Sequence, residues 1–187
     1  MNTIVVFASG SGSNAEKIIS YFEKVSHVEV LKVYTNNSKA GVIARVSSKG
    51  VPTRVFDRET YEKEVLDELK KLNPSLVVLA GFLWKIPQGY LSAFPSKIIN
   101  IHPSLLPKYG GKGMYGGHVF DAIVANKESE TGITIHYVNE HYDEGAIIFQ
   151  AKTSLSTSDT AESVAEKTHR LEHKHFAAVI HKLLENQ

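Results

Sequence analysis

The sequence has no cysteine, a single tryptophan and two methionines among its 187 residues. Without cysteine the chain forms no disulfide and offers no thiolate nucleophile, and a structural zinc site is not expected. No apolar run approaches the roughly 20 residues of a membrane-spanning helix, so we expect no membrane partner. The formal net charge of only +1 gives no general attraction to polyanions, which argues against nucleic acid as a partner.

Length and composition favour one compact domain. A chain of 187 residues with 42% hydrophobic and 22% charged residues is ordinary for a globular α/β protein with a sizeable core. Near its start, residues 3–8 resemble a buried strand. A signal peptide would have a basic region and a long apolar run there. We therefore expect a cytoplasmic protein.

Apolar strand-like segments alternate with amphipathic helical segments through the first part of the chain, as they do when helices join parallel strands. The predicted strands are residues 3–8, 28–35, 51–56, 75–80 and 98–102, and the predicted helices are residues 15–25, 40–49 and 58–72. Pro52 indicates that the third of these strands lies at an edge.

The C-terminal part has a different pattern. A helix is predicted at 118–126, and the strands 131–138 and 146–150 follow with no helix between them, which predicts an antiparallel hairpin. One long helix at 160–184 closes the chain, with Ser158 or Asp159 as its expected cap. Together the segments predict a doubly wound, mostly parallel, Rossmann-like sheet with an antiparallel C-terminal extension.

The most informative stretch is residues 98–107, IINIHPSLLP. Asn100 and His102 alternate with apolar residues, so both side chains project from one face of a strand. Pro103 then ends the strand. An amide and an imidazole at the end of a buried strand indicate a polar site. The alternative is a structural strand end, in which these side chains bond a turn, a core hydroxyl or a carbonyl.

A glycine-rich turn, SGSGSN at residues 9–14, lies between the first predicted strand and helix. This arrangement directs backbone N–H groups and a helix N-terminus at an anion, usually a phosphate. The turn lacks the third glycine of a dinucleotide site and the lysine of a triphosphate loop. The alternative is an ordinary turn capped by Ser13 or Asn14.

Two further segments could line a binding site. Residues 82–86, FLWKI, follow the fourth predicted strand and could form a wall for a flat ring, although Phe82 and Ile86 could equally fill the core while Trp84 packs on a helix. Five glycines lie within residues 108–117. They indicate a mobile loop or lid, in which Lys108 and Lys112 could meet an anion.

Histidines are concentrated in the long closing helix. His169 and His173 are four residues apart with Glu172 between them. A zinc protease helix carries its glutamate directly after the first histidine, so this order does not fit. We expect no metal.

Taken together, these motifs resemble the folate-dependent formyltransferases. The resemblance is carried by INIHPSLLP at residues 99–107, by GITIHYV at 132–138, by YDEG at 142–145 and by the turn at 9–14. It covers essentially the whole chain and implies a single formyltransferase domain over residues 1–187. The N-terminal half would hold the phosphate and ribonucleotide, and residues 75–150 would form the catalytic and folate side.

The resemblance also implies individual roles. The catalytic residues would be Asn100, His102 and Asp143. The substrate-binding residues would be Gly12, Ser13, Asn14, His169 and Glu172. The folate-binding residues would be Arg58, Leu83, Trp84, Lys85, Ile86, Asn100, Asn139, Glu140, His141, Tyr142 and Asp143. Many relatives have arginine at the position of Trp84. A cis peptide is implied at Leu106–Pro107.

The implied reaction transfers the formyl group of 10-formyltetrahydrofolate, as co-substrate, to the amine of glycinamide ribonucleotide in de novo purine biosynthesis. Asn100 and a protonated His102 would stabilise the oxyanion. Asp143 would raise the pKa of His102 and assist proton transfer. Alternatives are formyl transfer to another small amine, such as a sugar amine, or hydrolysis of the formylfolate. The expected partners are these small molecules, with the chain acting as a monomer or a homodimer.

Overall fold

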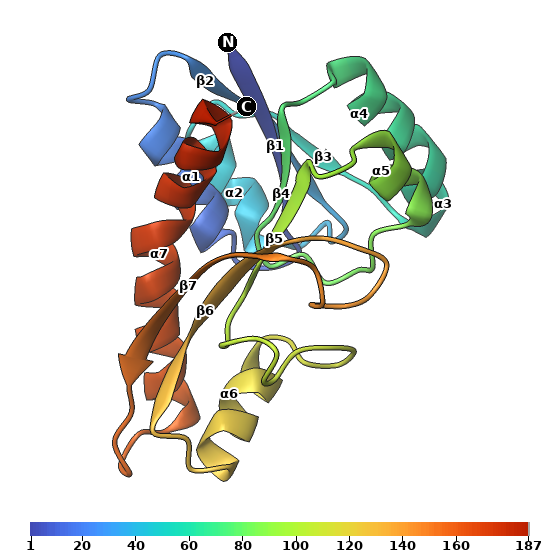
Figure 1. Cartoon of the computed structure of the whole chain (residues 1–187). Helices are drawn as coiled ribbons and strands as arrows, with labels where there is room; N and C mark the ends of the chain where they lie inside the picture. Colours follow the sequence, from blue (N-terminus) through green and yellow to red (C-terminus); the bar gives the residue numbers. More distant parts are fainter. Residues whose placement is uncertain (187) are drawn as a thin grey trace.

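A computed structural model, in which residues 1–186 are described, contains one seven-stranded sheet flanked by helices (Figure 1). The strands are β1 Asn2–Phe7, β2 Val28–Thr35, β3 Thr53–Val55, β4 Leu76–Leu79, β5 Ile98–His102, β6 Glu130–Tyr137 and β7 Ile147–Ser154. The helices are α1 Ser13–Phe22, α2 Gly41–Ser47, α3 Arg58–Thr60, the π-helical turn η1 Tyr61–Val65, α4 Leu66–Leu72, α5 Gln88–Ala93, α6 Gly117–Ala125 and α7 Ala161–Glu185.

The strand order is β3-β2-β1-β4-β5-β6-β7. The first five strands are parallel, β6 is antiparallel to β5, and β7 is antiparallel to β6. This confirms the predicted doubly wound sheet with an antiparallel C-terminal extension. The reversal at β6 places Asn100 directly opposite His136, and His102 opposite Thr134.

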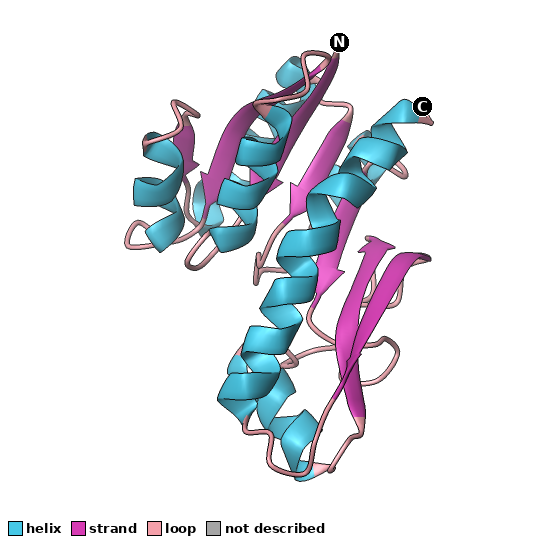
Figure 2. Ribbon diagram, turned by 90° about the vertical axis from the view of Figure 1, so that its left-hand side faces the viewer, coloured by secondary structure: helices cyan, strands magenta, loops and turns pink. Residues whose placement is uncertain are grey.

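Helices cover both faces of the sheet, and α7 runs along the length of one of them (Figure 2). Because side chains alternate along a strand, β1 serves both layers. Ile4 and Val6 belong to the core beside α1, α2 and α7, whereas Val5 and Phe7 belong to the core beside α4 and α5. None of the helices within residues 1–186 is both long enough and apolar enough to cross a bilayer.

Several local expectations differ from the structure. Helix α5 was not predicted, since it is short and contains Gly89. Strand β7 continues to Ser154, four residues beyond the prediction. The N-cap of α7 is Thr160, whose side chain accepts from the Ser163 amide, so the expected cap at Ser158 or Asp159 is wrong. The predicted helix over residues 58–72 is continuous but contains the η1 turn.

Candidate active site

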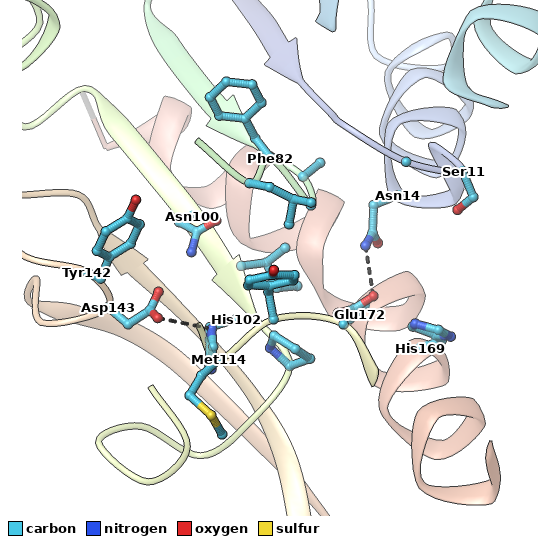
Figure 3. A pocket seen from close by; sticks show the side chains of 18 of the residues that line it. Ser11, Asn14, Phe82, Asn100, His102, Met114, Tyr142, Asp143, His169 and Glu172 are labelled. Atoms are coloured by element: carbon cyan, nitrogen blue, oxygen red, sulfur yellow. Dashed lines mark hydrogen bonds and ion pairs between the residues drawn. The ribbon is translucent and has the colours of Figure 1, made fainter. Parts of the chain in front are cut away.

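A cavity of about 550 Å³ opens at the carboxyl ends of β1, β4 and β5 (Figure 3). Ligands of doubly wound sheets bind at this edge because the loops after the strands converge there. The cavity brings together most of the side chains singled out in the sequence. Its lining includes Gly12, Ser13, Asn14, Leu83, Asn100, His102, Tyr142, Asp143, His169 and Glu172.

Asn100 is held by a histidine that the sequence did not single out. Its Nδ2 lies 3.1 Å from His136 Nε2, and His136 Nδ1 lies 2.8 Å from the Tyr137 carbonyl oxygen. A carbonyl only accepts, so Nδ1 carries the proton and Nε2 accepts from the Asn100 amide. This fixes the orientation of the amide. The alternation of Thr134 and His136 was visible in the sequence, but their position opposite Asn100 and His102 depends on the strand register.

His102 and Asp143 come together from separate segments. Asp143 Oδ2 lies 3.5 Å from His102 Nδ1, and Asp143 Oδ1 lies 3.7 Å from His136 Nε2. On its other side, His102 Nε2 donates to the Tyr109 carbonyl oxygen at 2.7 Å. His102 is buried. Its imidazole thus lies between a carboxylate and a main-chain carbonyl.

The expectation of a raised pKa for His102 is wrong. Burial lowers the pKa of His102, and this outweighs the raising effects of the Asp143 carboxylate and the Tyr109 carbonyl. For Asp143, burial acts to raise the pKa, but the neighbouring His136 and His102 imidazoles and the Gly111 amide together lower it. Both shifts favour an ionised aspartate beside a neutral imidazole.

The glycine-rich loop over residues 108–117 contacts this pair through its main chain. Besides the Tyr109 carbonyl, the Gly111 amide donates to Asp143 Oδ2 at 2.9 Å. A Cβ at Gly110 would lie 2.6 Å from Leu106 Cδ2 and 3.2 Å from Asp143 Cβ, so the loop fits closely here. The implied cis peptide at Leu106–Pro107 is present.

The two lysines of this loop point in different directions. Lys108 pairs with Glu128 at 3.0 Å, and both residues line a separate hollow of about 230 Å³. Lys112 lines the cavity itself. Of the two cations expected to meet an anion, only Lys112 is placed to reach a ligand in the cavity.

The opposite end of the cavity is built by the start of α1. Gly12, in the left-handed conformation with φ 77°, is the N-cap, and no side chain caps this helix, so the alternative of a cap at Ser13 or Asn14 is wrong. Its backbone amides therefore remain for a ligand. A Cβ at Gly12 would lie only 2.4 Å from Val42 Cγ2, so this close approach of α1 and α2 requires glycine.

Glu172 reaches this end of the cavity from α7. Asn14 Nδ2 donates to Glu172 Oε2 at 2.8 Å, and Glu172 is only 6% exposed. Burial raises the pKa of Glu172, against the lowering effects of Asn14 and His169. His169 lines the same cavity, with its ring 6.0 Å from that of Phe120 in an edge-on arrangement.

A second hollow, of about 70 Å³, lies on the other side of Asn100 and Asp143. The residues that line it are Leu79, Phe82, Trp84, Lys85, Ile86, Asn100, His136, Val138, Asn139, His141, Tyr142 and Asp143. Phe82 and Ile86 are buried in the core, as the alternative interpretation of this loop proposed. Tyr142 is exposed, with Lys85 Nζ 5.9 Å from the centre of its ring.

Two of the expected folate residues, Arg58 and Glu140, line neither the main cavity nor the 70 Å³ hollow. The Arg58 guanidinium lies over the ring of Trp84, 3.8 Å from its centre, and both residues line a further, broad and open hollow. Trp84 also packs edge-on against Phe56 and Tyr61. Glu140 is exposed and lies 3.7 Å from His141.

A doubly wound sheet with a glycine-rich turn at an uncapped helix N-terminus and an Asn–His–Asp cluster at its carboxyl edge defines an α/β protein with a small-molecule cavity and groups suited to acyl and proton transfer. More specifically, the chain belongs to the formyl transferase family, whose sequence model matches residues 2–180.

Relatives support this assignment over the whole chain. Phosphoribosylglycinamide formyltransferase of Bacillus subtilis is 35% identical, over 98% of this chain and 95% of that protein. The chloroplastic enzyme of Vigna unguiculata is 38% identical, over 98% of this chain, but the chain spans only 61% of its length, and 66% of the Arabidopsis thaliana one.

Solved structures agree. Glycinamide ribonucleotide transformylase 1 from Geobacillus kaustophilus is 34% identical with a TM-score of 0.88, over 98% of this chain and 99% of that one. The phosphoribosylglycinamide formyltransferase from Bacillus halodurans is 37% identical with a TM-score of 0.87, over 98% and 95%.

Proposed function

We propose that this chain transfers the formyl group of 10-formyltetrahydrofolate to the amine of glycinamide ribonucleotide, a step of de novo purine biosynthesis in the cytoplasm. One observation carries the proposal. A single cavity joins the open N-terminus of α1 and the buried Glu172 to the Asn100, His102 and Asp143 cluster. A phosphorylated substrate anchored at one end would thereby present its amine at the other.

The ribonucleotide is assigned to the α1 end. Its phosphate would accept hydrogen bonds from the backbone amides of Gly12, Ser13 and Asn14 and from the Ser13 hydroxyl, with the helix dipole favouring the negative charge. Glu172, oriented by Asn14 and flanked by His169, would accept hydrogen bonds from ribose hydroxyls.

The formylfolate is assigned to the 70 Å³ hollow beside Asn100 and Asp143. Its flat ring would lie among Leu83, Ile86 and the loop over residues 139–143, with the formyl group directed at Asn100 and Asp143. The outer end of the molecule, which carries carboxylates, would extend past Trp84 toward Lys85 and Arg58, the cations on that side.

The chemistry follows from the groups around the reacting carbon. The substrate amine attacks the formyl carbon, the new C–N bond forms, and the carbonyl oxygen becomes an oxyanion. The Asn100 amide, with one N–H bonded to His136, has a second N–H to donate to that oxygen. The bond from the formyl carbon to the folate nitrogen then breaks.

The proton moves in the opposite direction to the formyl group. Because the Tyr109 carbonyl holds the His102 proton on Nε2, a neutral imidazole presents an unprotonated Nδ1 beside Asp143. That nitrogen would take the proton of the attacking amine, and Asp143 would stabilise the resulting imidazolium. His102 thus becomes a positively charged hydrogen-bond donor at the moment when the oxyanion forms. The same pair then returns the proton to the leaving folate nitrogen.

The test is an absorbance assay for tetrahydrofolate release from 10-formyltetrahydrofolate, run with and without glycinamide ribonucleotide. We expect release that requires the ribonucleotide and yields an equal amount of formylated product. Release at the same rate without an acceptor amine would identify a hydrolase. Release that requires a sugar amine instead would overturn the proposed substrate.

A further inference from the structure

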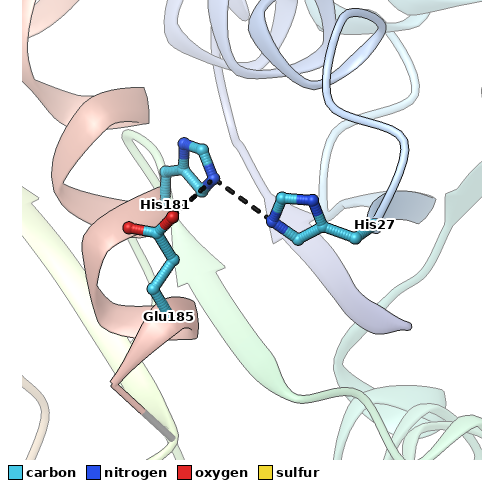
Figure 4. Close-up of side chains that lie close together, drawn as sticks. All are labelled: His27, His181 and Glu185. Carbon is cyan, nitrogen blue, oxygen red and sulfur yellow. Dashed lines mark hydrogen bonds and ion pairs between the residues drawn. The ribbon is translucent and has the colours of Figure 1, made fainter.

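At the end of the sheet opposite the cavity, two histidines and a glutamate lie close together (Figure 4). His181 Nε2 is 3.4 Å from His27 Nε2 and 3.6 Å from Glu185 Oε1. His181 and Glu185 are one helical turn apart on α7, whereas His27 immediately precedes β2. We propose that these three side chains form a site for a divalent transition metal such as Zn²⁺.

The spacing fits a single ion. Two nitrogens bound to one tetrahedral Zn²⁺ at about 2.0–2.1 Å lie roughly 3.4 Å apart. The distance between the two histidine nitrogens has this value, and all three ligand atoms lie within 4.8 Å of one another. Two imidazoles and one carboxylate are ligands that zinc accepts, and three protein ligands leave a fourth position for water. The ion would therefore be bound but exchangeable.

A neighbouring tyrosine supports the ligand geometry. Tyr21 Oη lies 3.0 Å from His181 Nδ1. When this nitrogen donates to the tyrosine oxygen, the proton is held on Nδ1, and Nε2 presents its lone pair to the other ligands. Metal-bound histidines typically have such a partner on the second ring nitrogen. The Tyr21 and Phe22 rings pack edge-on against the same imidazole.

Hydrogen bonds from Asn2 hold the two segments in place. The Asn2 amide donates to the His27 carbonyl oxygen at 2.8 Å, and Asn2 Nδ2 donates to the Leu184 carbonyl oxygen at 3.1 Å. The same residue thus links the turn before β2 to the last turn of α7. A metal here would add a cross-link between elements that already lie side by side.

This site uses other residues than the metal site considered from the sequence. His169 and His173 drew attention through their spacing on one helix, but within residues 1–186 only His27, His181 and Glu185 gather as three such ligands. His27 and His181 are 154 residues apart in the sequence, so their approach depends on the fold.

The experiment is a calorimetric titration of the full chain with Zn²⁺, using protein that carries no histidine tag and has been stripped with a chelator. We expect one equivalent to bind. His27→Ala, His181→Ala and Glu185→Gln should each weaken binding strongly, and Tyr21→Phe should weaken it about tenfold. His175→Ala serves as the matched control, since it removes another partly exposed histidine of α7, and it should bind like the wild type.

Thermal unfolding provides the second readout. Zn²⁺ should raise the Tm of the wild type and the control but not that of the His27→Ala and His181→Ala variants. Because the site is remote from the cavity, formyl transfer should be the same in all of these variants without metal. Wild-type binding no tighter than that of a His27→Ala/His181→Ala double variant would overturn the proposal. A variant that failed to fold would leave the decision to Glu185→Gln, whose side chain is 59% exposed.

Discussion

Asn100 and His136 face each other across the β5–β6 pair, joined by a 3.1 Å hydrogen bond from the amide nitrogen to Nε2. The bond decides which end of the Asn100 amide points at a ligand. With nitrogen toward the imidazole, a second N–H is free to donate. A flipped amide would instead direct its oxygen at a developing negative charge, and repulsion would replace stabilisation.

Replacing His136 should therefore lower kcat without a comparable change in either KM. We expect His136→Leu to lose about tenfold to a hundredfold in kcat, the usual effect of a misplaced catalytic group. His136→Gln, whose side-chain oxygen can accept the same hydrogen bond, should recover part of the loss. Steady-state kinetics and Tm measured together separate this effect from unfolding. Equal activity in the two variants would exclude an orienting role.

Asp143→Asn should reduce kcat by about 10²- to 10⁴-fold, the range of general acid–base contributions. The Asp143 backbone is left-handed, with φ 58°. Asparagine tolerates this conformation, so the variant removes the charge and keeps the loop. Binding of both substrates, measured by calorimetry, should persist. Glu144→Gln, which neutralises the exposed carboxylate next in the chain, is the control and should retain wild-type rates.

Ser13→Ala should raise the KM for the ribonucleotide and leave the KM for the formylfolate unchanged. A hydrogen bond to a charged group contributes roughly 1.5–3 kcal/mol, which corresponds to about a tenfold or greater increase. Ser48→Ala removes an exposed hydroxyl that donates to the Arg45 carbonyl, and it should change neither constant. A change confined to the folate KM would show that the two substrate ends are exchanged.

Glu172→Gln should stabilise the fold while weakening ribonucleotide binding. Burial raises the pKa of Glu172, so the folded state holds its proton more tightly than the unfolded state. Stability is therefore lost as pH rises from below the unfolded pKa of about 4.3 through the folded one. The variant removes this loss, and its gain in Tm should be larger at pH 7 than at pH 4. A gain independent of pH would contradict this account.

Gly110→Ala should lower kcat about tenfold or more by displacing the glycine-rich loop from Asp143. The added methyl group would lie 3.2 Å from Asp143 Cβ and closer still to the Leu106 side chain. Gly117→Ala is the control. Gly117 is the first residue of α6, and a Cβ added there would meet nothing within 4 Å. That variant should keep full activity and gain about 0.5–1 kcal/mol of stability.

Much of the fold could be predicted from the sequence because its central strands are almost wholly apolar. The second strand was predicted at its observed bounds, Val28–Thr35. Helix α5 escaped because its six residues give no periodic pattern, and it is held instead by tertiary packing. Its Tyr90 is fully buried and donates a hydrogen bond to the Tyr61 carbonyl at 2.5 Å.

Site residues that are close together in the sequence could be predicted from it. Those that depend on strand register or on burial could not. Asn100 and His102 stand out because polar residues are unusual in a buried strand. His136 could be recognised only once the antiparallel register was known. The pKa of His102 could not be inferred from its neighbour Asp143 alone, since the extent of burial, which has the larger effect, is set by the whole fold.

The polar groups that we propose to surround the reacting carbon lie in parts of the molecule that tolerate substitution to different degrees. Asn100 and His136 are fixed in paired strands, where a change in one would disturb the sheet. Asp143 lies in the connection from β6 to β7, where lineages can exchange residues and insert new ones at little cost. A different formyl donor could thus be accommodated by remodelling that connection, while the amide proposed to receive the carbonyl oxygen stays where the sheet holds it.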